Sequence, residues 1–240
     1  MNKVFLILCL VFLISGCSTE DNAKEVVDEN SNVVVSDLLQ FQDSYPDDQP
    51  VAIMSTDFGD IVIVLFPEVA PKAVENFSVH AENGYYDSLT FHRIIEGFMI
   101  QGGDPVGDGT GGTSIWNEGF EIEVGYELFH FRGALAMART SLPKSQGSQF
   151  YLVQSDSKDL AYEYEENVEE KYQEVGGVSQ LDGNYTVFGQ TIEGYDVIDK
   201  IAGVKKKAEV DASGSQSVPE SNVYINTIKM TTYKEYINSK

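Results

Sequence analysis

Cysteine is nearly absent from this chain of 240 residues: it has two, Cys9 and Cys17, both near the N-terminus. The remainder therefore contains neither an intrachain disulfide nor a thiolate metal cage. Hydrophobic residues make up 42% of the chain and aromatic residues 11%, which excludes disorder over most of its length. Folding has to depend on the packing of one sizeable core, because no covalent staple is available.

Basic residues are also scarce. Lysine and arginine number 16 against 38 aspartates and glutamates, for a net charge of −22. Such a chain cannot neutralise many phosphates and has no favourable field toward an anionic lipid surface. We therefore exclude nucleic acid as a partner.

Histidine is the third rarity, and it bears on metal binding. His80, His92 and His130 are the three histidines, and their spacings of 12 and 38 residues match no local ligand motif. Ser148 lies in a Gly-Ser-Gln sequence that lacks the second glycine of a nucleophile elbow. We predict no metal site, and the sequence shows no sign of a hydrolase.

One glycine pattern has the spacing of a dinucleotide-binding loop. Gly107, Gly109 and Gly112 satisfy G-x-G-x-x-G, but the next residues, 113–116, do not open a helix. Because the pyrophosphate in such a site rests on a helix N-terminus, we predict no nucleotide cofactor here.

No hydrophobic run is long enough to span a bilayer. Val4 to Ile14 are eleven apolar residues after Lys3, whereas a spanning helix needs roughly 20. Ile14-Ser15-Gly16-Cys17 resembles the bacterial lipoprotein lipobox, so residues 1–16 are predicted to be a signal peptide and Cys17 the lipidated first residue. The resemblance implies a location outside the cytoplasm, with a lipid anchor in the bacterial cell membrane. The alternative is a plain secretory signal with an incidental cysteine.

Residues 17–50 differ in composition from residues 51–240. From Ser18 to Pro50 there are nine acids against Lys24 alone, and few apolar residues. This composition is typical of a solvated flexible tether. We place the start of the folded domain at Val51 and expect a single domain over 51–240, because no long polar linker divides it.

Short strands dominate the pattern of residues 51–240. Val51–Thr56 and Ile61–Phe66 predict a hairpin with a four-residue turn at 57–60. Helices are predicted from Pro71 to Asn83 and around 197–201. Further strands are expected at 90–95, 98–101, 133–138, 149–154, 186–192 and 224–230. Many short strands with two core helices predict a mainly β fold, a closed antiparallel barrel or a sandwich.

Residues 156–175 have the character of an insertion. They hold eight acids, while Leu160, Tyr164, Val168 and Tyr172 recur every four residues. This spacing predicts an amphipathic helix lying against the body. It is either a solvated flap or a partner-binding element, and the flap is the simpler interpretation.

The stretch from Phe91 to Pro105 places an arginine among apolar side chains. Alternation along a strand puts Arg93 on the same face as Phe91 and Ile95, and places Gln101 beside Met99 on the next strand. Taken alone, this pattern also fits an arginine that pairs with one of the many acids at the rim of the fold.

The same stretch, Phe-His-Arg-Ile-Ile-Glu-Gly-Phe-Met-Ile-Gln-Gly-Gly-Asp-Pro, closely resembles the signature of the cyclophilin family of peptidyl-prolyl isomerases. The resemblance continues through 107–112, 137–138, 147–151 and 181–189, and covers nearly all of residues 51–232. It implies a closed eight-stranded antiparallel barrel capped by two helices. Glu96 replaces the family's usual proline, Tyr151 a phenylalanine, Arg139 a common asparagine and Tyr185 a frequent histidine.

The resemblance also implies residue roles for isomerising X-Pro bonds. Arg93 would donate to the prolyl nitrogen of the twisted amide; Phe98, Met99, Tyr151 and Leu181 would line a proline pocket; Gln101 and Gln149 would contact peptide backbone; and Ala138, Arg139, Thr140 and Tyr185 would border the groove. We count Arg93 and Gln101 as catalytic. Rotation of the amide needs differential binding of the twisted state, and no cofactor or metal.

The expected partners are proline-containing exported polypeptides, with the protein acting as a monomer. The rival hypothesis is a non-catalytic peptide-binding or scaffold module that uses the same groove. Retention of Arg93 favours the enzyme, because a binding pocket could dispense with a desolvated guanidinium.

Overall fold

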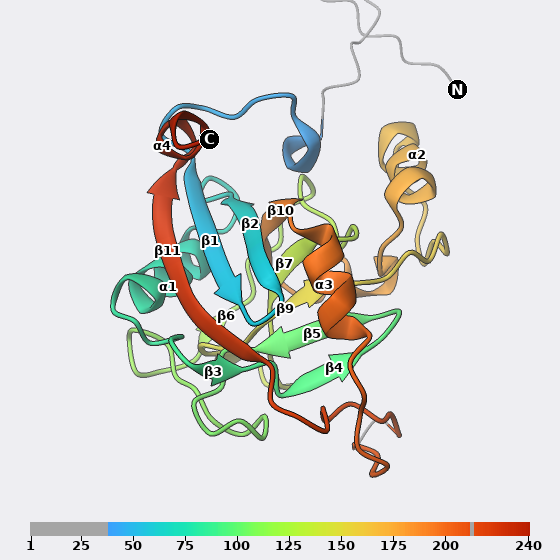
Figure 1. Cartoon of the computed structure of the whole chain (residues 1–240). Coiled ribbons are helices and arrows are strands. Elements are labelled where there is room, and N and C mark those ends of the chain that lie inside the picture. Colours follow the sequence, from blue (N-terminus) through green and yellow to red (C-terminus); the bar gives the residue numbers. More distant parts are fainter. Residues whose placement is uncertain (1–37, 212–213) are drawn as a thin grey trace, which may run out of the picture. The chain divides into compact units, whose positions relative to one another are not determined.

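A nine-stranded antiparallel sheet organises the residues that the computed structural model describes, 38–211 and 214–240 (Figure 1). Its strand order is β3-β11-β1-β2-β10-β7-β9-β5-β4. The strands are β1 (Pro50–Thr56), β2 (Gly59–Leu65), β3 (Leu89–Thr90), β4 (Arg93–Ile95), β5 (Met99–Gly102), β7 (Ala134–Met137), β9 (Phe150–Val153), β10 (Val187–Glu193) and β11 (Tyr224–Thr232). A second, small sheet pairs β6 (Phe120–Glu121) with β8 (Lys144–Gln146).

The helices are α1 (Pro71–Glu82), α2 (Glu166–Val175), α3 (Tyr195–Ala202) and α4 (Tyr233–Asn238). The predicted signal peptide, Cys17 and most of the predicted tether lie outside the described residues. Within the described part of the chain, every helix falls short of the length and apolar character that a membrane span requires.

The sheet curls into an open half-barrel, so the mainly β antiparallel fold is confirmed and the closed eight-stranded barrel is not. Among the described residues, β3 and β4 end the strand order and do not pair with each other. The chain turns between them, and irregular segments cover the gap: Phe91 N donates to Val223 O at 3.0 Å, and Ile94 N donates to Ser217 O at 2.7 Å. These two hydrogen bonds pair backbone groups near the edge of the sheet, although no continuous strand pairing runs there. They limit the exposure of unpaired backbone groups.

The hairpin of β1 and β2 is confirmed, with a shorter turn than expected. Thr56 pairs with Gly59, so only Asp57 and Phe58 lie between the strands. The Thr56 hydroxyl accepts from Phe58 N and donates to Gly59 O. Gly59 has φ +125°, a value that side-chain-bearing residues rarely adopt, which explains a glycine at this position.

Both predicted core helices form, and they pack on the inner face of the sheet. Pro71 is the first residue of α1, and Glu123 accepts hydrogen bonds from the backbone N–H groups of Lys72 and Ala73 at 3.1 and 2.9 Å. Phe77 of α1 lies at the centre of an aromatic cluster with Tyr86, Phe150 and Phe188, at centroid distances of 5.3–5.4 Å. The core is thus built against the helix that the sequence predicted from Pro71 to Asn83.

The register of β4 and β5 places Arg93 opposite Gln101 and Ile95 opposite Met99. This confirms the pairing of Met99 and Gln101 on one face. Phe91, however, is fully buried in the inner core, whereas Ile95 packs in the cluster on the other side of the sheet. The alternation from Phe91 was wrong because the chain bends between β3 and β4.

Residues 38–50 are a packed part of the folded unit, although we assigned them to the tether. Gln40 is 1% exposed and donates to Phe129 O and to Gln190 Oε1, both at 2.9 Å. Leu38 and Phe41 contact the cluster around Phe131. The sequence of this segment does not predict the packing, because its partners are distant in the chain. The hydrogen-bond partners of Gln40, for example, lie 89 and 150 residues away.

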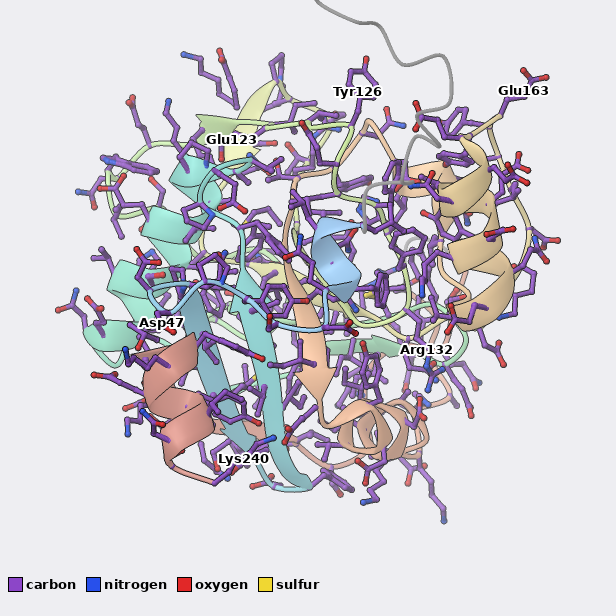
Figure 2. The ribbon with its side chains drawn as sticks, turned by 90° about the horizontal axis from the view of Figure 1, so that it is seen from above. Asp47, Glu123, Tyr126, Arg132, Glu163 and Lys240 are labelled. Atoms are coloured by element: carbon purple, nitrogen blue, oxygen red, sulfur yellow. The ribbon has the colours of Figure 1, made fainter. Side chains whose placement is uncertain are left out.

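The insertion is helical only in its second half. Helix α2 covers Glu166–Val175, with Val168 and Tyr172 buried. Leu160 and Tyr164 precede the helix, yet all four residues of the predicted stripe pack in the cluster with Phe131. The acids face outward, as Glu163 does in Figure 2.

Candidate active site

One hollow on the outer side of the sheet collects nine of the predicted site residues. This main hollow is lined by Arg93, Phe98, Met99, Gln101, Ala138, Arg139, Tyr151, Leu181 and Tyr185. They come from β4, β5 and β9, from Phe98 just before β5, from the segment after β7, and from the 181–185 segment. Strand pairing explains the convergence: Gln101 lies between Arg93 on β4 and Tyr151 on β9.

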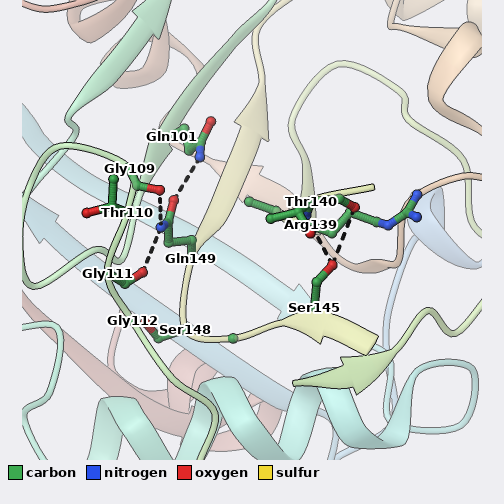
Figure 3. A pocket seen from close by; sticks show the side chains of 12 residues that line it. Gln101, Gly109, Thr110, Gly111, Gly112, Arg139, Thr140, Ser145, Ser148 and Gln149 are labelled. Atoms are coloured by element: carbon green, nitrogen blue, oxygen red, sulfur yellow. Dashed lines mark hydrogen bonds between the residues drawn. The ribbon is translucent and has the colours of Figure 1, made fainter. Parts of the chain in front are cut away.

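The two remaining residues, Thr140 and Gln149, line a side hollow that shares Gln101, Ala138 and Arg139 with the main one (Figure 3). Gln101 donates from Nε2 to Gln149 Oε1 at 2.9 Å. Thr140 N donates to Ser145 Oγ at 3.1 Å. The amides of Gln101 and Gln149 thus form one polar unit at the junction of the two hollows.

The loop 109–112 forms a wall of the side hollow that sequence reasoning missed. Gln149 donates from Nε2 to Gly109 O at 3.0 Å and to Gly111 O at 2.8 Å (Figure 3). The closely spaced glycines were the available signal, because they allow close backbone approach. The family resemblance covers 107–112 as well, but it assigns no site role to these residues.

The Asp104 carboxylate holds the backbone that leads into that loop. It is 1% exposed and accepts backbone N–H bonds from Val106, Asp108 and Gly109 at 2.6–3.2 Å. Burial raises the pKa of the Asp104 carboxyl, but hydrogen bonds from backbone N–H groups more than offset this, and the pKa lies below its usual value. Asp104 is therefore an ionised acceptor at neutral pH.

Arg93 lines the main hollow and also forms an ion pair. Its Nε donates to Asp211 Oδ2 at 2.9 Å, and the two side chains are 28% and 18% exposed. Its Nη1 lies 3.8 Å from the sulfur of Met99. The two interpretations of Arg93, a site residue and a partner of an acid, thus describe the same side chain. Asp211 was not foreseen, because one acid among 38 gives no signal.

The floor of the main hollow is apolar and aromatic. Met99 is 2% exposed and Tyr151 is 4% exposed, and the rings of Tyr151 and Tyr185 meet edge to face at 5.9 Å. Arg139 lies over the Tyr185 ring at 5.6 Å and donates to Asn184 O. Burial raises the pKa of the Tyr151 phenol well above its usual value, so this group stays neutral.

A metal centre has no ready set of ligands in the described part of the chain. Over 38–211 and 214–240, histidine, cysteine, aspartate and glutamate side chains nowhere gather in a group of three suited to a metal ion. The two hollows themselves present hydrogen-bond donors around an apolar floor.

His92, next to Arg93, is expected to make the stability of the protein depend on pH. It is 7% exposed, and among the described residues neither ring nitrogen has a hydrogen-bond partner. Burial lowers its pKa, as it does that of His80. The unfolded chain therefore binds protons more readily below pH about 6.5, and we expect the free energy of unfolding to fall as pH drops from about 7.5 to about 5.5.

Chemical denaturation at several pH values measures this effect. His92→Phe should flatten the pH dependence, leaving the contribution of His80. An unchanged slope in the variant would contradict the assignment to His92.

Known proteins resemble this chain in sequence and in structure. Residues 51–230 match the family described as cyclophilin type peptidyl-prolyl cis-trans isomerase/CLD. A Staphylococcus saprophyticus protein named as a peptidyl-prolyl cis-trans isomerase is 44% identical over 185 residues, covering 74% of this chain and 90% of the relative. A Streptococcus pyogenes protein, named as a bifunctional phosphatase and peptidyl-prolyl cis-trans isomerase, is 44% identical over 75% of this chain. This chain spans only 38% of that longer protein.

Among solved structures, a Cryptosporidium parvum cyclophilin-type isomerase aligns with a TM-score of 0.62 and 30% identity. The alignment covers 76% of this chain and 99% of that one, whose crystals were studied in the presence of the dipeptide Ala-Pro.

Proposed function

Since the chain belongs to the family of cyclophilin-type peptidyl-prolyl cis-trans isomerases, we propose that it rotates X-Pro bonds in the main hollow, with Arg93 as the catalytic donor. The observation that carries this proposal is a guanidinium at the wall of an apolar, aromatic-floored hollow. The solved relative that was studied with Ala-Pro supports a proline-containing peptide as substrate.

Amide resonance is the barrier that the site has to overcome. It gives the X-Pro C–N bond partial double-bond character, and rotation costs roughly 18–20 kcal/mol. In the twisted state the prolyl nitrogen regains a lone pair, which Arg93 meets with a charged N–H donor. The Arg93 Nε bond to Asp211 restricts the guanidinium, so less freedom is lost when the substrate binds. The interaction is stronger in the twisted state than in the planar one, which is the condition for catalysis.

The other residues hold the peptide. The proline ring rests on Phe98, Met99, Leu181 and Tyr151, where burial of apolar surface favours binding. Gln101, the second catalytic residue, and Gln149 present amides to the peptide backbone at the junction of the hollows. Ala138, Arg139, Thr140 and Tyr185 border the path of the neighbouring residues.

A protease-coupled assay tests this function. An X-Pro peptide whose trans form alone is cleaved should isomerise faster with the protein, in proportion to its concentration. Binding of the same peptide with no acceleration would instead identify a peptide-binding module.

The N-terminal sequence supports a proposal about location. We propose that Cys17 is lipidated after removal of residues 1–16, and that the isomerase assists the folding of exported polypeptides outside the cytoplasm. The support is the Ile14–Cys17 sequence after an apolar run, together with the absence of cysteine from all later positions.

Replacing Cys17 tests the anchor. Wild-type protein should incorporate labelled fatty acid and fractionate with membranes, whereas Cys17→Ser should remain unlabelled, because serine has no thiol to acylate. Cys9→Ser is the matched control and should behave as wild type. Unlabelled, soluble wild-type protein would refute the proposal.

A further inference from the structure

The hydroxyl of Tyr151 forms a hydrogen bond with His130, a buried residue that does not line the main hollow. His130 Nε2 lies 2.9 Å from the Tyr151 hydroxyl oxygen, and the two rings are parallel to within 12°. His130 is 1% exposed, so this hydrogen bond is sealed from water. An unpaired hydroxyl or ring nitrogen at this depth is destabilising, which makes the pair interdependent.

Asp182 determines which nitrogen of His130 carries the proton. Asp182 Oδ1 lies 2.7 Å from His130 Nδ1 and also accepts from His130 N at 2.8 Å. Because this oxygen is an acceptor, Nδ1 has to supply a proton, and in the singly protonated ring Nε2 is then left as an acceptor for the Tyr151 hydroxyl, which burial keeps protonated. The Tyr151 hydroxyl therefore donates to Nε2, and its proton is directed away from the main hollow.

The insertion completes the arrangement. Tyr164 and Tyr172 both donate from their hydroxyls to Asp182 Oδ2 at 2.7 Å. Burial raises the pKa of each phenol, so both remain protonated donors. Both oxygens of Asp182 are thus engaged as acceptors, and a continuous series of hydrogen bonds leads from the insertion to the floor of the hollow.

From these contacts we propose that His130 and Asp182 are positioning residues, supported by the insertion, that make Tyr151 an apolar floor for the proline ring. The proposal rests on the function proposed above for the main hollow. It accounts for a tyrosine where the family usually has phenylalanine. The Tyr151 hydroxyl bonds to His130, and the face of the ring is left to contact the substrate. It also gives the insertion a part in the site, through Tyr164 and Tyr172.

A rescue experiment tests the proposal. In His130→Leu the Tyr151 hydroxyl loses its acceptor and competes for water in the hollow, which the proline ring then has to displace. We expect KM for an X-Pro peptide to rise about 5- to 20-fold, with a smaller change in kcat. Adding Tyr151→Phe removes the orphaned hydroxyl and should return KM to within about threefold of wild type. A purely structural defect would be worsened, or left unchanged, by the second substitution.

A further variant tests the contribution of the insertion to KM. Tyr164→Phe combined with Tyr172→Phe removes both donors to Asp182 Oδ2 and should raise KM in the same direction as His130→Leu. Tyr162→Phe is the matched control, because this tyrosine is 49% exposed and lies outside the series.

Nitrogen NMR of histidine-labelled wild-type protein gives a readout that does not depend on a variant's folding. His130 should show a protonated Nδ1 and an unprotonated Nε2 at neutral pH. The opposite tautomer, or a double variant with KM no better than that of His130→Leu, would overturn the proposal. A wild-type protein without isomerase activity would instead refute the proposed function, and the tautomer would still test the hydrogen-bond series.

Discussion

Replacing Arg93 by alanine is expected to lower kcat/KM for an X-Pro peptide about 10- to 1000-fold while the fold persists. A charged donor aimed at the reaction centre is worth on the order of 1.5–4 kcal/mol in the transition state. The side chain is 28% exposed, so its removal leaves no large cavity. The measurement is the protease-coupled rate at several enzyme concentrations, together with circular dichroism.

Arg132→Ala is the matched control for Arg93→Ala. Arg132 is also an ion-paired arginine of similar exposure, with its Nη2 2.6 Å from Asp199 Oδ2, but it is not among the residues that line the main hollow. It should retain turnover within about threefold of wild type, since a partly exposed ion pair contributes little to stability. Normal turnover in folded Arg93→Ala would remove Arg93 from the catalytic role.

Asp104→Ala should destabilise the protein by about 3 kcal/mol and weaken catalysis through Gln149. The substitution leaves the N–H groups of Val106, Asp108 and Gly109 without their buried acceptor, at about 1 kcal/mol for each lost hydrogen bond. For a domain of this size, the melting temperature should fall by about 6–12 °C. Because Gly109 O holds Gln149, kcat/KM should fall as well.

Two variants make the Asp104 test specific. Asp108→Ala removes an exposed acid close by, whose carboxylate accepts from Thr110, and should change stability by less than about 1 kcal/mol. Asp104→Asn keeps one oxygen acceptor and should fall between wild type and Asp104→Ala. A melting temperature of Asp104→Ala equal to that of Asp108→Ala would show that the loop is organised by other contacts.

The sequence alone determined the features that depend on near neighbours. Period-2 and period-3.6 patterns of apolar residues predicted the β1–β2 hairpin, α1 and α3. The spacing of apolar residues along a short segment indicates which face of a strand or helix is buried. The residue types of the site also came from sequence, since the motif resemblance carried them by position. Nine of them then line one hollow.

Only the tertiary structure decided the contacts between distant segments. Arg93 and Asp211 are 118 residues apart, and Asp182 reaches His130 across 52 residues. The sequence predicted neither Asp211 nor Asp182 as a partner. The spacing of polar residues does not indicate which distant residue each one contacts, and acids are common throughout this chain. Closure of the sheet was likewise undetermined, since it depends on how the chain turns between β3 and β4. These choices follow from the packing of the whole unit, which satisfies buried donors and acceptors together.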